Sequence, residues 1–378
     1  LILFAIPLAF SSILQQLFNS ADVAVVGHFA GDTALAAVGS CVALVGIFVN
    51  LIVGLSVGPN AALATLIGQK KREEISGMLH TVITFGLILG VVLMGIGLLT
   101  ARVVLELSGT PESVMNEALL YIRIYFLSIP FMTIYNFGAA ALRSFGDSRR
   151  PMYYLFISGI VNVILNLILV ICFHLGVAGV AIATVISNVL SAGLVMLNLH
   201  RRKDEFQFRV QKMRIDGNAL RRVLVIGIPA GIQGAIFAVS NVFIQSGINS
   251  FGEDAIAGSS LALNFEYFTY DIASAFAQAA VTFTSQNYGA GNLKRCKKIF
   301  WLCMLFGIVF TEILAIIFMI WDDFFVEIYT ASSAVAVYGL IRMHHVCSLE
   351  GLTATYEVES AALRGMGKSL EPSIITIL

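Results

Sequence analysis

The chain has 378 residues, of which 58% are hydrophobic and 12% are charged, and its mean hydropathy is +0.88. A soluble domain has about 45–50% apolar and about 25% charged residues, so this composition excludes one and indicates a membrane protein. The 23 basic and 23 acidic residues balance, so no overall field favours nucleic acid as a partner.

Runs of about 20 mostly apolar residues, the length that crosses a bilayer, recur along the whole chain. They predict ten membrane-spanning helices, at 3–26, 34–67, 78–100, 118–142, 152–173, 177–199, 223–249, 255–288, 299–321 and 334–363. An eleventh span begins at Pro372. We expect the protein to continue beyond both ends of this sequence, because it opens at Leu1 inside an apolar run.

Lysine and arginine are concentrated in alternate loops. The loops after even-numbered spans hold 20 of the 23 basic residues, whereas the loops after odd-numbered spans hold Arg102 alone. Because positive charge accumulates in cytoplasmic loops, the pattern predicts that the even loops and the N-terminus are cytoplasmic. A basic stretch over 201–222 is expected to be a cytoplasmic linker between an N-terminal lobe of six spans (1–200) and a C-terminal lobe (223–378).

One dozen residues occurs twice in the chain. The string AALRSFGDSRRP at 140–151 and the string AALRGMGKSLEP at 361–372 agree at seven of twelve positions. At the same offset of 221, Gly68 matches Gly289. The halves are therefore predicted to be parallel copies of one six-helix unit, an arrangement found in transporters that bind substrate between two lobes. Most of spans eleven and twelve lies outside this sequence.

The repeated string also places equivalent residues at two helix ends. Arg143 and Arg364 end spans four and ten, where a cation meets the carbonyl end of the helix dipole. Gly146 and Gly367 can take the left-handed backbone conformation that follows a helix. We interpret these residues as structural, in preference to a cytoplasmic gate.

The strings PLAFSSILQQLFNSADVAVVGHFAG, YNFGAAALRSFGDSRRP, NVILNLIL and VTFTSQNYGAG resemble bacterial members of the multidrug and toxic compound extrusion (MATE) family. The resemblance covers essentially the whole chain. It implies an all-α fold of twelve membrane helices in two lobes. It also implies an antiporter that exports organic, often cationic, compounds in exchange for H⁺ or Na⁺, without a cofactor, in the bacterial plasma membrane. We expect a monomer.

An ionisable group inside a span is costly and is therefore a candidate for function. Asp22 lies in the first span on one helical face with Gln15 and Asn19, and that span has no Lys or Arg. A dry environment would favour a proton on its carboxylate. The alternative is that Asp22 lies near the outer membrane interface.

The resemblance implies a cation site in the N-terminal lobe. Its residues in this sequence are Asp22, Asn136, Asn162, Asn166 and Thr184. Asn166 departs from the DinF-like branch, which has an Asp there, and the lost carboxylate favours a proton over tight sodium binding. For the asparagines, ordinary hydrogen bonds between helices are the alternative.

The C-terminal lobe has its own candidates. Glu266 and Glu357 are predicted to couple transport to a cation, and the alternative is a salt bridge with a partner such as Arg342 or His345. Aromatic rings can stack on an organic cation. The candidate substrate contacts are Tyr135, Tyr267, Tyr270, Tyr356 and Gln278.

A lipid-linked-precursor flippase of the same wider superfamily is the alternative function. It would require a basic central cavity, yet only Arg123 and Arg342 lie inside predicted spans, each near an outer end. An enzyme is disfavoured, because the sequence has no phosphate-binding loop, His-Glu-x-x-His or Gly-x-Ser-x-Gly motif. The five cysteines lack paired spacing and favour neither disulfides nor a metal site.

Overall fold

The computed structural model describes residues 1–330 and 332–377, and helices make up most of this part of the chain. The first half contains α1 (Ile2–Phe29), α2 (Asp32–Leu55), α3 (Val57–Gly68), α4 (Arg72–Leu107), α5 (Glu112–Phe126), α6 (Ile129–Ser144), α7 (Arg149–Leu167), a π-helical turn (Ile168–Cys172) and α8 (Gly176–Arg201). The second half contains a 3₁₀ turn (Val210–Lys212), α9 (Gly217–Asn249), α10 (Glu253–Gly289), α11 (Leu293–Ile320), α12 (Asp322–Tyr329), α13 (Ser333–Cys347), α14 (Glu350–Gly365) and α15 (Leu370–Ile377).

Seven helices of the described chain are long and apolar enough to cross a membrane, or eight if the bent pair α5–α6 is one span. The bend of 42° falls before Pro130, whose ring suits the first turn of a new helix. The second predicted span is one of the seven, and a turn at Ser56 separates its two parts, α2 and α3. Pro59 lies three residues into α3 and lacks the N–H that would continue the helix from Leu55.

The two halves meet in a reciprocal contact between α3 and the end of α10. A Cβ atom added at Gly68 would overlap the carbonyl oxygen of Gln286, and one added at Gly289 would overlap the carbonyl oxygen of Thr65. Gly68 and Gly289 are equivalent in the repeat, and Thr65 and Gln286 are separated by the same offset of 221. A contact in which each partner mirrors the other is typical of a two-fold axis.

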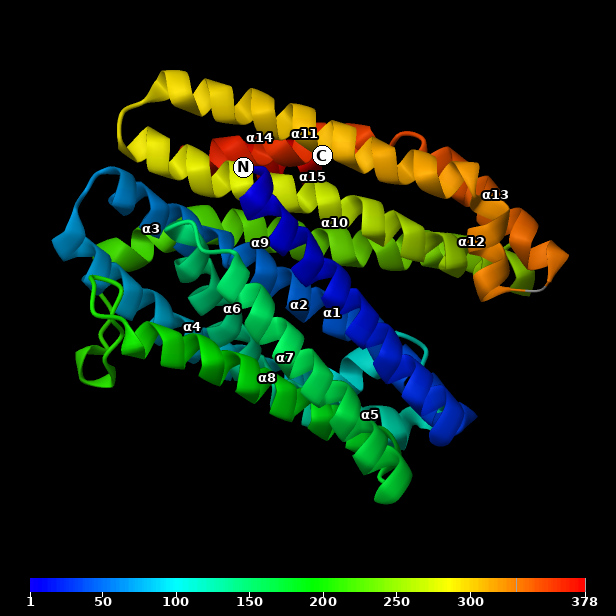
Figure 1. Cartoon of the computed structure of the whole chain (residues 1–378). Coiled ribbons are helices and arrows are strands. Elements are labelled where there is room, and N and C mark those ends of the chain that lie inside the picture. The colour runs from blue at the N-terminus through cyan, green and yellow to red at the C-terminus, as the bar shows by residue number, and fades with distance from the viewer. Residues whose placement is uncertain (331, 378) are drawn as a thin grey trace.

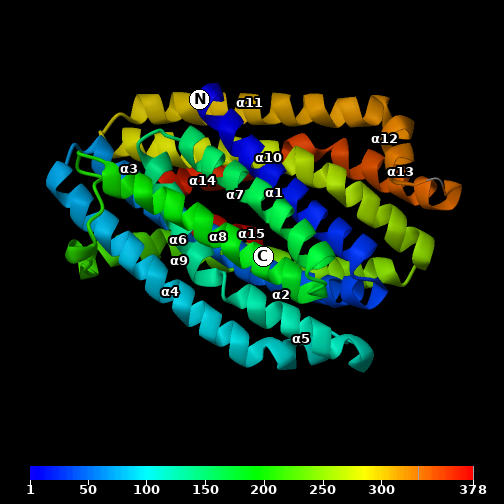
Figure 2. The same ribbon diagram turned by 60° about the horizontal axis from the view of Figure 1, so that its bottom comes forward.

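Further contacts hold the same interface. Asn60 of α3 donates a hydrogen bond of 2.9 Å from Nδ2 to the Thr282 hydroxyl of α10, and both side chains are buried. Glycines also bring the backbones of α2 and α9 together, at Gly54 and Gly231. The helices of the two lobes converge at the end that carries loops 69–71 and 290–292, and they diverge toward the other end (Figures 1 and 2).

The segment between the lobes is packed rather than free. It runs between Arg201 and Gly217, and Phe206 and Phe208 are buried in the core of the N-terminal lobe. His80 of α4 accepts a hydrogen bond of 3.1 Å from the Arg209 backbone N–H. The linker therefore belongs structurally to the N-terminal lobe.

We expect the close approach of α3 and α10 to tolerate no side chain. Gly68→Ala should destabilise the protein by about 1–3 kcal/mol, because the added methyl meets backbone rather than a movable side chain. The measurement is thermal unfolding of the detergent-purified protein. Gly193→Ala is the matched control, because Gly193 faces open space in α8 and alanine favours a helix by about 1 kcal/mol. A Gly68→Ala protein that melts at or above the wild-type temperature would contradict the close-contact argument.

Candidate functional site

A polar cluster lies inside the N-terminal lobe where α1, α7 and α8 meet. The Asn166 amide donates a hydrogen bond to the Asp22 carboxylate and a second one, of 3.3 Å, to Asn162 Oδ1. The Thr184 hydroxyl of α8 lies beside Asp22 and donates its hydrogen bond of 3.0 Å to the Val180 carbonyl. Asn162 and Asn166 are buried. The structure thus brings together four of the five residues of the predicted N-terminal cation site.

This cluster offers oxygen atoms and no cationic side chain. Asn166 Oδ1 is buried and accepts no hydrogen bond within the described chain. The Asn166 amide nitrogen faces both the Asp22 carboxylate and Asn162 Oδ1, so the cluster places one carboxylate among neutral polar groups. Asp22 therefore lies in a polar cluster between helices.

Asn136, the fifth predicted member, lies elsewhere. Its amide donates a hydrogen bond of 2.9 Å to the Met132 carbonyl, one turn earlier in α6, and its side chain lines a cavity between the lobes. Gln15 of α1 lines the same cavity. The polar stripe of α1 therefore connects two sites, since Gln15 faces the cavity and Asp22 lies two turns further along the helix, in the cluster.

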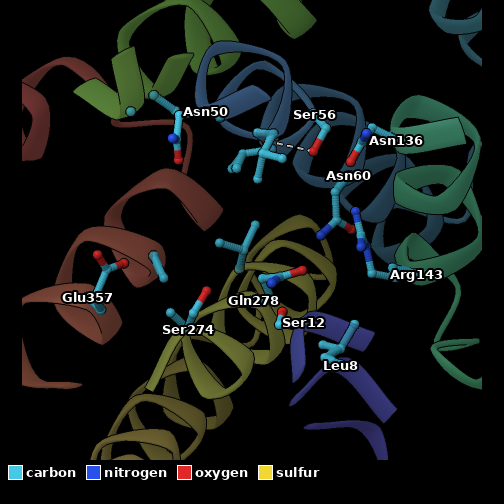
Figure 3. Close-up of a pocket in the computed structure, with 18 of the residues that line it drawn as sticks. Leu8, Ser12, Asn50, Ser56, Asn60, Asn136, Arg143, Ser274, Gln278 and Glu357 are labelled. Carbon is cyan, nitrogen blue, oxygen red and sulfur yellow. Dashed lines mark hydrogen bonds between the residues drawn. The ribbon is translucent and has the colours of Figure 1, made fainter. Parts of the chain in front are cut away.

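The cavity between the lobes has a volume of about 210 Å³. Both lobes contribute to its wall, α1, α2, α3, α6 and α7 from the first and α9, α10 and α14 from the second. Figure 3 shows Arg143 extending from α6 toward Asn60, with Glu357 of α14 on the opposite side and Gln278 of α10 between them. Its position between lobes is typical of ligand sites in transporters built from repeats.

Three of the predicted substrate contacts line this cavity, namely Tyr135, Tyr270 and Gln278. The Tyr270 hydroxyl donates a hydrogen bond of 3.2 Å to Glu357, which also lines the cavity. Tyr267 and Tyr356 are not part of the cavity wall in the described structure, although Tyr356 hydrogen-bonds Glu357. Their assignment as substrate contacts stays a prediction.

The arginines of the repeated string lie where sequence reasoning did not place them. Gly146 and Gly367 have positive φ values of 95° and 84°, as predicted for residues that follow helix ends. Arg143 and Arg364, however, line the central cavity. The prediction that this cavity lacks basic residues was wrong. Side chains on a helix lean toward its N-terminus, so an arginine in the last turn extends back into the membrane region.

Glu266 is not a free carboxylate in this structure. Its two oxygens accept hydrogen bonds of 2.5 and 2.8 Å from the Arg342 guanidinium, which also donates to the Ser259 hydroxyl. A paired fork of this kind stabilises charge on both partners. The salt bridge, considered above as the alternative, is the arrangement that the structure contains. Glu266 in this conformation is therefore a weaker candidate for coupling than Glu357.

Sequence reasoning missed two residues that help to form the cavity. Asn60 is linked to Thr282 across the lobes, and Gln233 of α9 accepts a hydrogen bond of 2.5 Å from Arg364. The only available signal was that Asn60 and Thr282 are 222 positions apart, one more than the repeat offset of 221, which by itself does not indicate contact. Among the described residues, no group of His, Cys, Asp and Glu is arranged to hold a metal ion.

Comparisons with known proteins agree with this architecture. A solved MATE structure in the straight conformation aligns with a TM-score of 0.92 and 22% identity, over 100% of this chain and 84% of that one. The probable multidrug resistance protein YoeA of Bacillus subtilis is 28% identical over 383 residues, which cover 99% of this chain and 82% of the relative.

Two further relatives carry different names. The probable multidrug resistance protein NorM of Thermotoga maritima is 24% identical over 385 residues, covering 100% of this chain and 82% of the relative. The FAD transporter of Shewanella oneidensis is 25% identical over 306 residues, covering 79% and 67%. The MatE family model matches residues 7–168 and 229–378. The chain therefore belongs to the MatE family of multi-pass membrane transporters.

Proposed function

We propose that this protein is a secondary active exporter that moves a small organic compound outward in exchange for protons. The compound binds in the central cavity, and the two lobes rock about the α3–α10 contact to expose the cavity to each side in turn. The observation that carries the proposal is the relation between two sites on α1. The cavity between the lobes is lined by Gln15 of α1, and the Asp22 carboxylate lies two turns further along α1, inside the N-terminal lobe.

The names of the relatives support export of small organic compounds. YoeA and NorM are named as probable multidrug resistance proteins, and one relative is named as a FAD transporter. The cargo of such proteins is therefore not confined to one chemical class. Cavities that admit varied compounds rely on a few polar groups within mostly apolar walls.

Protonation of Asp22 would change the packing of α1. The ionised carboxylate accepts the hydrogen bond from the Asn166 amide. A protonated carboxyl still accepts at its carbonyl oxygen but also presents an O–H donor, which needs an acceptor that the ionised carboxylate does not need. Because Gln15 on the same helix faces the cavity, a shift of α1 against α7 would move Gln15 and change the cavity wall.

The energetics allow coupling to protons. One charge that moves through about 150 mV releases about 3.5 kcal/mol. Exchange of one proton could therefore sustain an outward concentration ratio of about a few hundredfold. The single carboxylate of the cluster favours a proton over sodium, because a bare sodium ion gains more from a second negative ligand.

The orientation of the chain completes the proposal. The loops that we expect to be cytoplasmic lie at the end where the lobes converge, and the lobes diverge at the other end (Figure 1). The end at which the lobes diverge would then face the outside, with the N-terminus cytoplasmic and the protein in the bacterial plasma membrane.

A flippase for lipid-linked precursors remains the second candidate function, because Arg143 and Arg364 make the central cavity basic. Phosphate groups of such a lipid would find two guanidinium partners there. A fluorescent isoprenyl phosphate that crosses the bilayer of proteoliposomes without an ion gradient would favour this function over gradient-driven export.

Export should follow the proton gradient and depend on Asp22. Proteoliposomes loaded with carboxyfluorescein or, separately, with rhodamine 6G should lose at least one dye faster under external acidification than under a sodium gradient of equal size. Asp22→Asn should reduce this efflux to the rate of protein-free liposomes. Asp254→Asn is the control, because Asp254 is exposed at the start of α10. An Asp22→Asn protein that exports at the full rate would remove Asp22 from the mechanism.

A second carboxylate in the cluster should change the ion that drives export. We expect Asn166→Asp to make dye efflux respond to a sodium gradient, because two adjacent carboxylates compete for one proton and favour a bound cation. Efflux is measured at constant pH with increasing external sodium. Asn116→Asp, at an exposed site in α5, adds the same charge away from the cluster. Proton-driven efflux that persists in Asn166→Asp without any sodium response would show that charge at this position does not select the ion.

A further inference from the structure

The central cavity carries one arginine from each lobe. Arg143 ends α6 and Arg364 ends α14, at equivalent positions of the repeat, and both line the cavity. Glu357 is the one acidic residue in the described wall. The formal charge of the wall is therefore positive whether or not Glu357 is ionised.

Both arginines have hydrogen-bonding capacity left over. The Nε atoms of Arg143 and Arg364 are buried and have no hydrogen-bond partner in the described chain. Arg364 is only 9% exposed, and Gln233 accepts from one of its terminal nitrogens. A buried charged donor without a partner is costly, and native proteins keep such groups in membrane segments mainly for function.

Glu357 does not neutralise either arginine directly. No ion pair within 4.0 Å joins it to Arg143 or Arg364 among the described residues. It accepts a hydrogen bond from Tyr270 instead. It is two helical turns before Arg364 on α14, so its charge acts on Arg364 at a distance. The guanidinium groups therefore remain available to a ligand.

We propose that the central cavity recognises an anionic group, a carboxylate or a phosphate, on the transported compound. This inference rests on the proposed function, in that the cavity is taken as the substrate site. Arginine suits the role because its planar fork matches carboxylate and phosphate oxygens. The cationic substrate that the family resemblance implied would instead meet two like charges.

The rest of the wall fits an organic anion rather than an inorganic one. Asn60 and Asn136 supply amide groups beside Arg143. Apolar side chains such as Phe237 and Val53 also line the cavity. An anion between the arginines would also join the lobes, because Arg143 belongs to one lobe and Arg364 to the other. Its binding would replace repulsion across the interface with two attractive contacts.

The test compares two dyes of similar framework and opposite charge. Fluorescence anisotropy measures equilibrium binding of carboxyfluorescein, an anion, and rhodamine 6G, a cation, to the purified protein in detergent. Arg143→Gln and Arg364→Gln should each weaken carboxyfluorescein binding about tenfold or more, the loss expected for one charged hydrogen-bond partner. Glu357→Gln should strengthen carboxyfluorescein binding, because it removes the competing negative charge.

Two further variants separate charge recognition from damage to the fold. Arg364→Lys keeps the charge and should retain most of the carboxyfluorescein binding that Arg364→Gln loses. Arg123→Gln removes an exposed arginine from α5 and should bind both dyes as the wild type does. Every variant is first checked for a monodisperse peak in size-exclusion chromatography. Two results would overturn the proposal. One is unchanged carboxyfluorescein binding in both Arg143→Gln and Arg364→Gln. The other is a wild-type protein that binds no carboxyfluorescein and binds rhodamine 6G more tightly than Glu357→Gln does.

Competition identifies the source of the anion. Displacement of carboxyfluorescein by geranyl phosphate, but not by geraniol, indicates a lipid phosphate, and displacement by uridine diphosphate indicates a soluble phosphate. Displacement by neither, with carboxyfluorescein binding that still needs both arginines, indicates a carboxylate. The binding assay needs no gradient, so it is independent of the efflux assay. If anion binding is intact but gradient-driven efflux is absent, the exporter function is rejected and the anion site is kept. If efflux is intact but the cavity binds only the cationic dye, the anion site is rejected and the exporter function is kept.

Discussion

The reciprocal backbone contact between α3 and the end of α10 is the constraint on which the rest of the structure depends. It requires glycine at both Gly68 and Gly289, since any Cβ atom there would overlap a carbonyl of the partner helix. Because each lobe presents the same surface to the other, the contact fixes a two-fold relation between lobes. It also closes the molecule at one end, so the remaining helices can diverge from there and leave a cavity between them.

The position of this axis explains the polarity of the cavity. Helices α6 and α14 are equivalent in the repeat, and both end near the closed side of the interface, so their terminal arginines reach the same space. Duplication of the chain thus doubles a positive charge that a single lobe would carry once. Glu357 breaks this symmetry, because its counterpart in the first lobe is Asn136. Each lobe therefore contributes one arginine to the cavity, but only the C-terminal lobe contributes a carboxylate. This difference between the lobes suits a ligand that binds in one preferred direction.

Asp22 and Glu266, one carboxylate from each lobe, have different kinds of partner. Asp22 accepts a hydrogen bond from the neutral Asn166 amide and lies beside the Thr184 hydroxyl, and these groups leave its charge uncompensated. Glu266 is held by the Arg342 guanidinium, which compensates it fully. Both residues are acids inside predicted spans, and the cost of burying their charge is similar. Their partners differ, because Asp22 keeps an uncompensated charge beside neutral groups, whereas Glu266 links α10 to α13 through Arg342.

The sequence by itself determined the membrane class, eight of the ten predicted spans if the bent pair α5–α6 counts as one, the duplication and the helix ends at Gly146 and Gly367, because these follow from local composition and from spacing along one helix. The family resemblance also anticipated that Asp22, Asn162, Asn166 and Thr184 meet. Only the tertiary structure decided that Asn136 leaves this cluster, that Arg342 pairs with Glu266, and that Arg143 and Arg364 enter the cavity. Helical periodicity gives the face on which a residue lies, but the neighbour that meets this face depends on how helices distant in sequence cross. For the arginines, the sequence places the end of a span only to within a few residues, and the long side chain leans back along its helix. These two factors decide whether the charge lies at the surface or in the cavity.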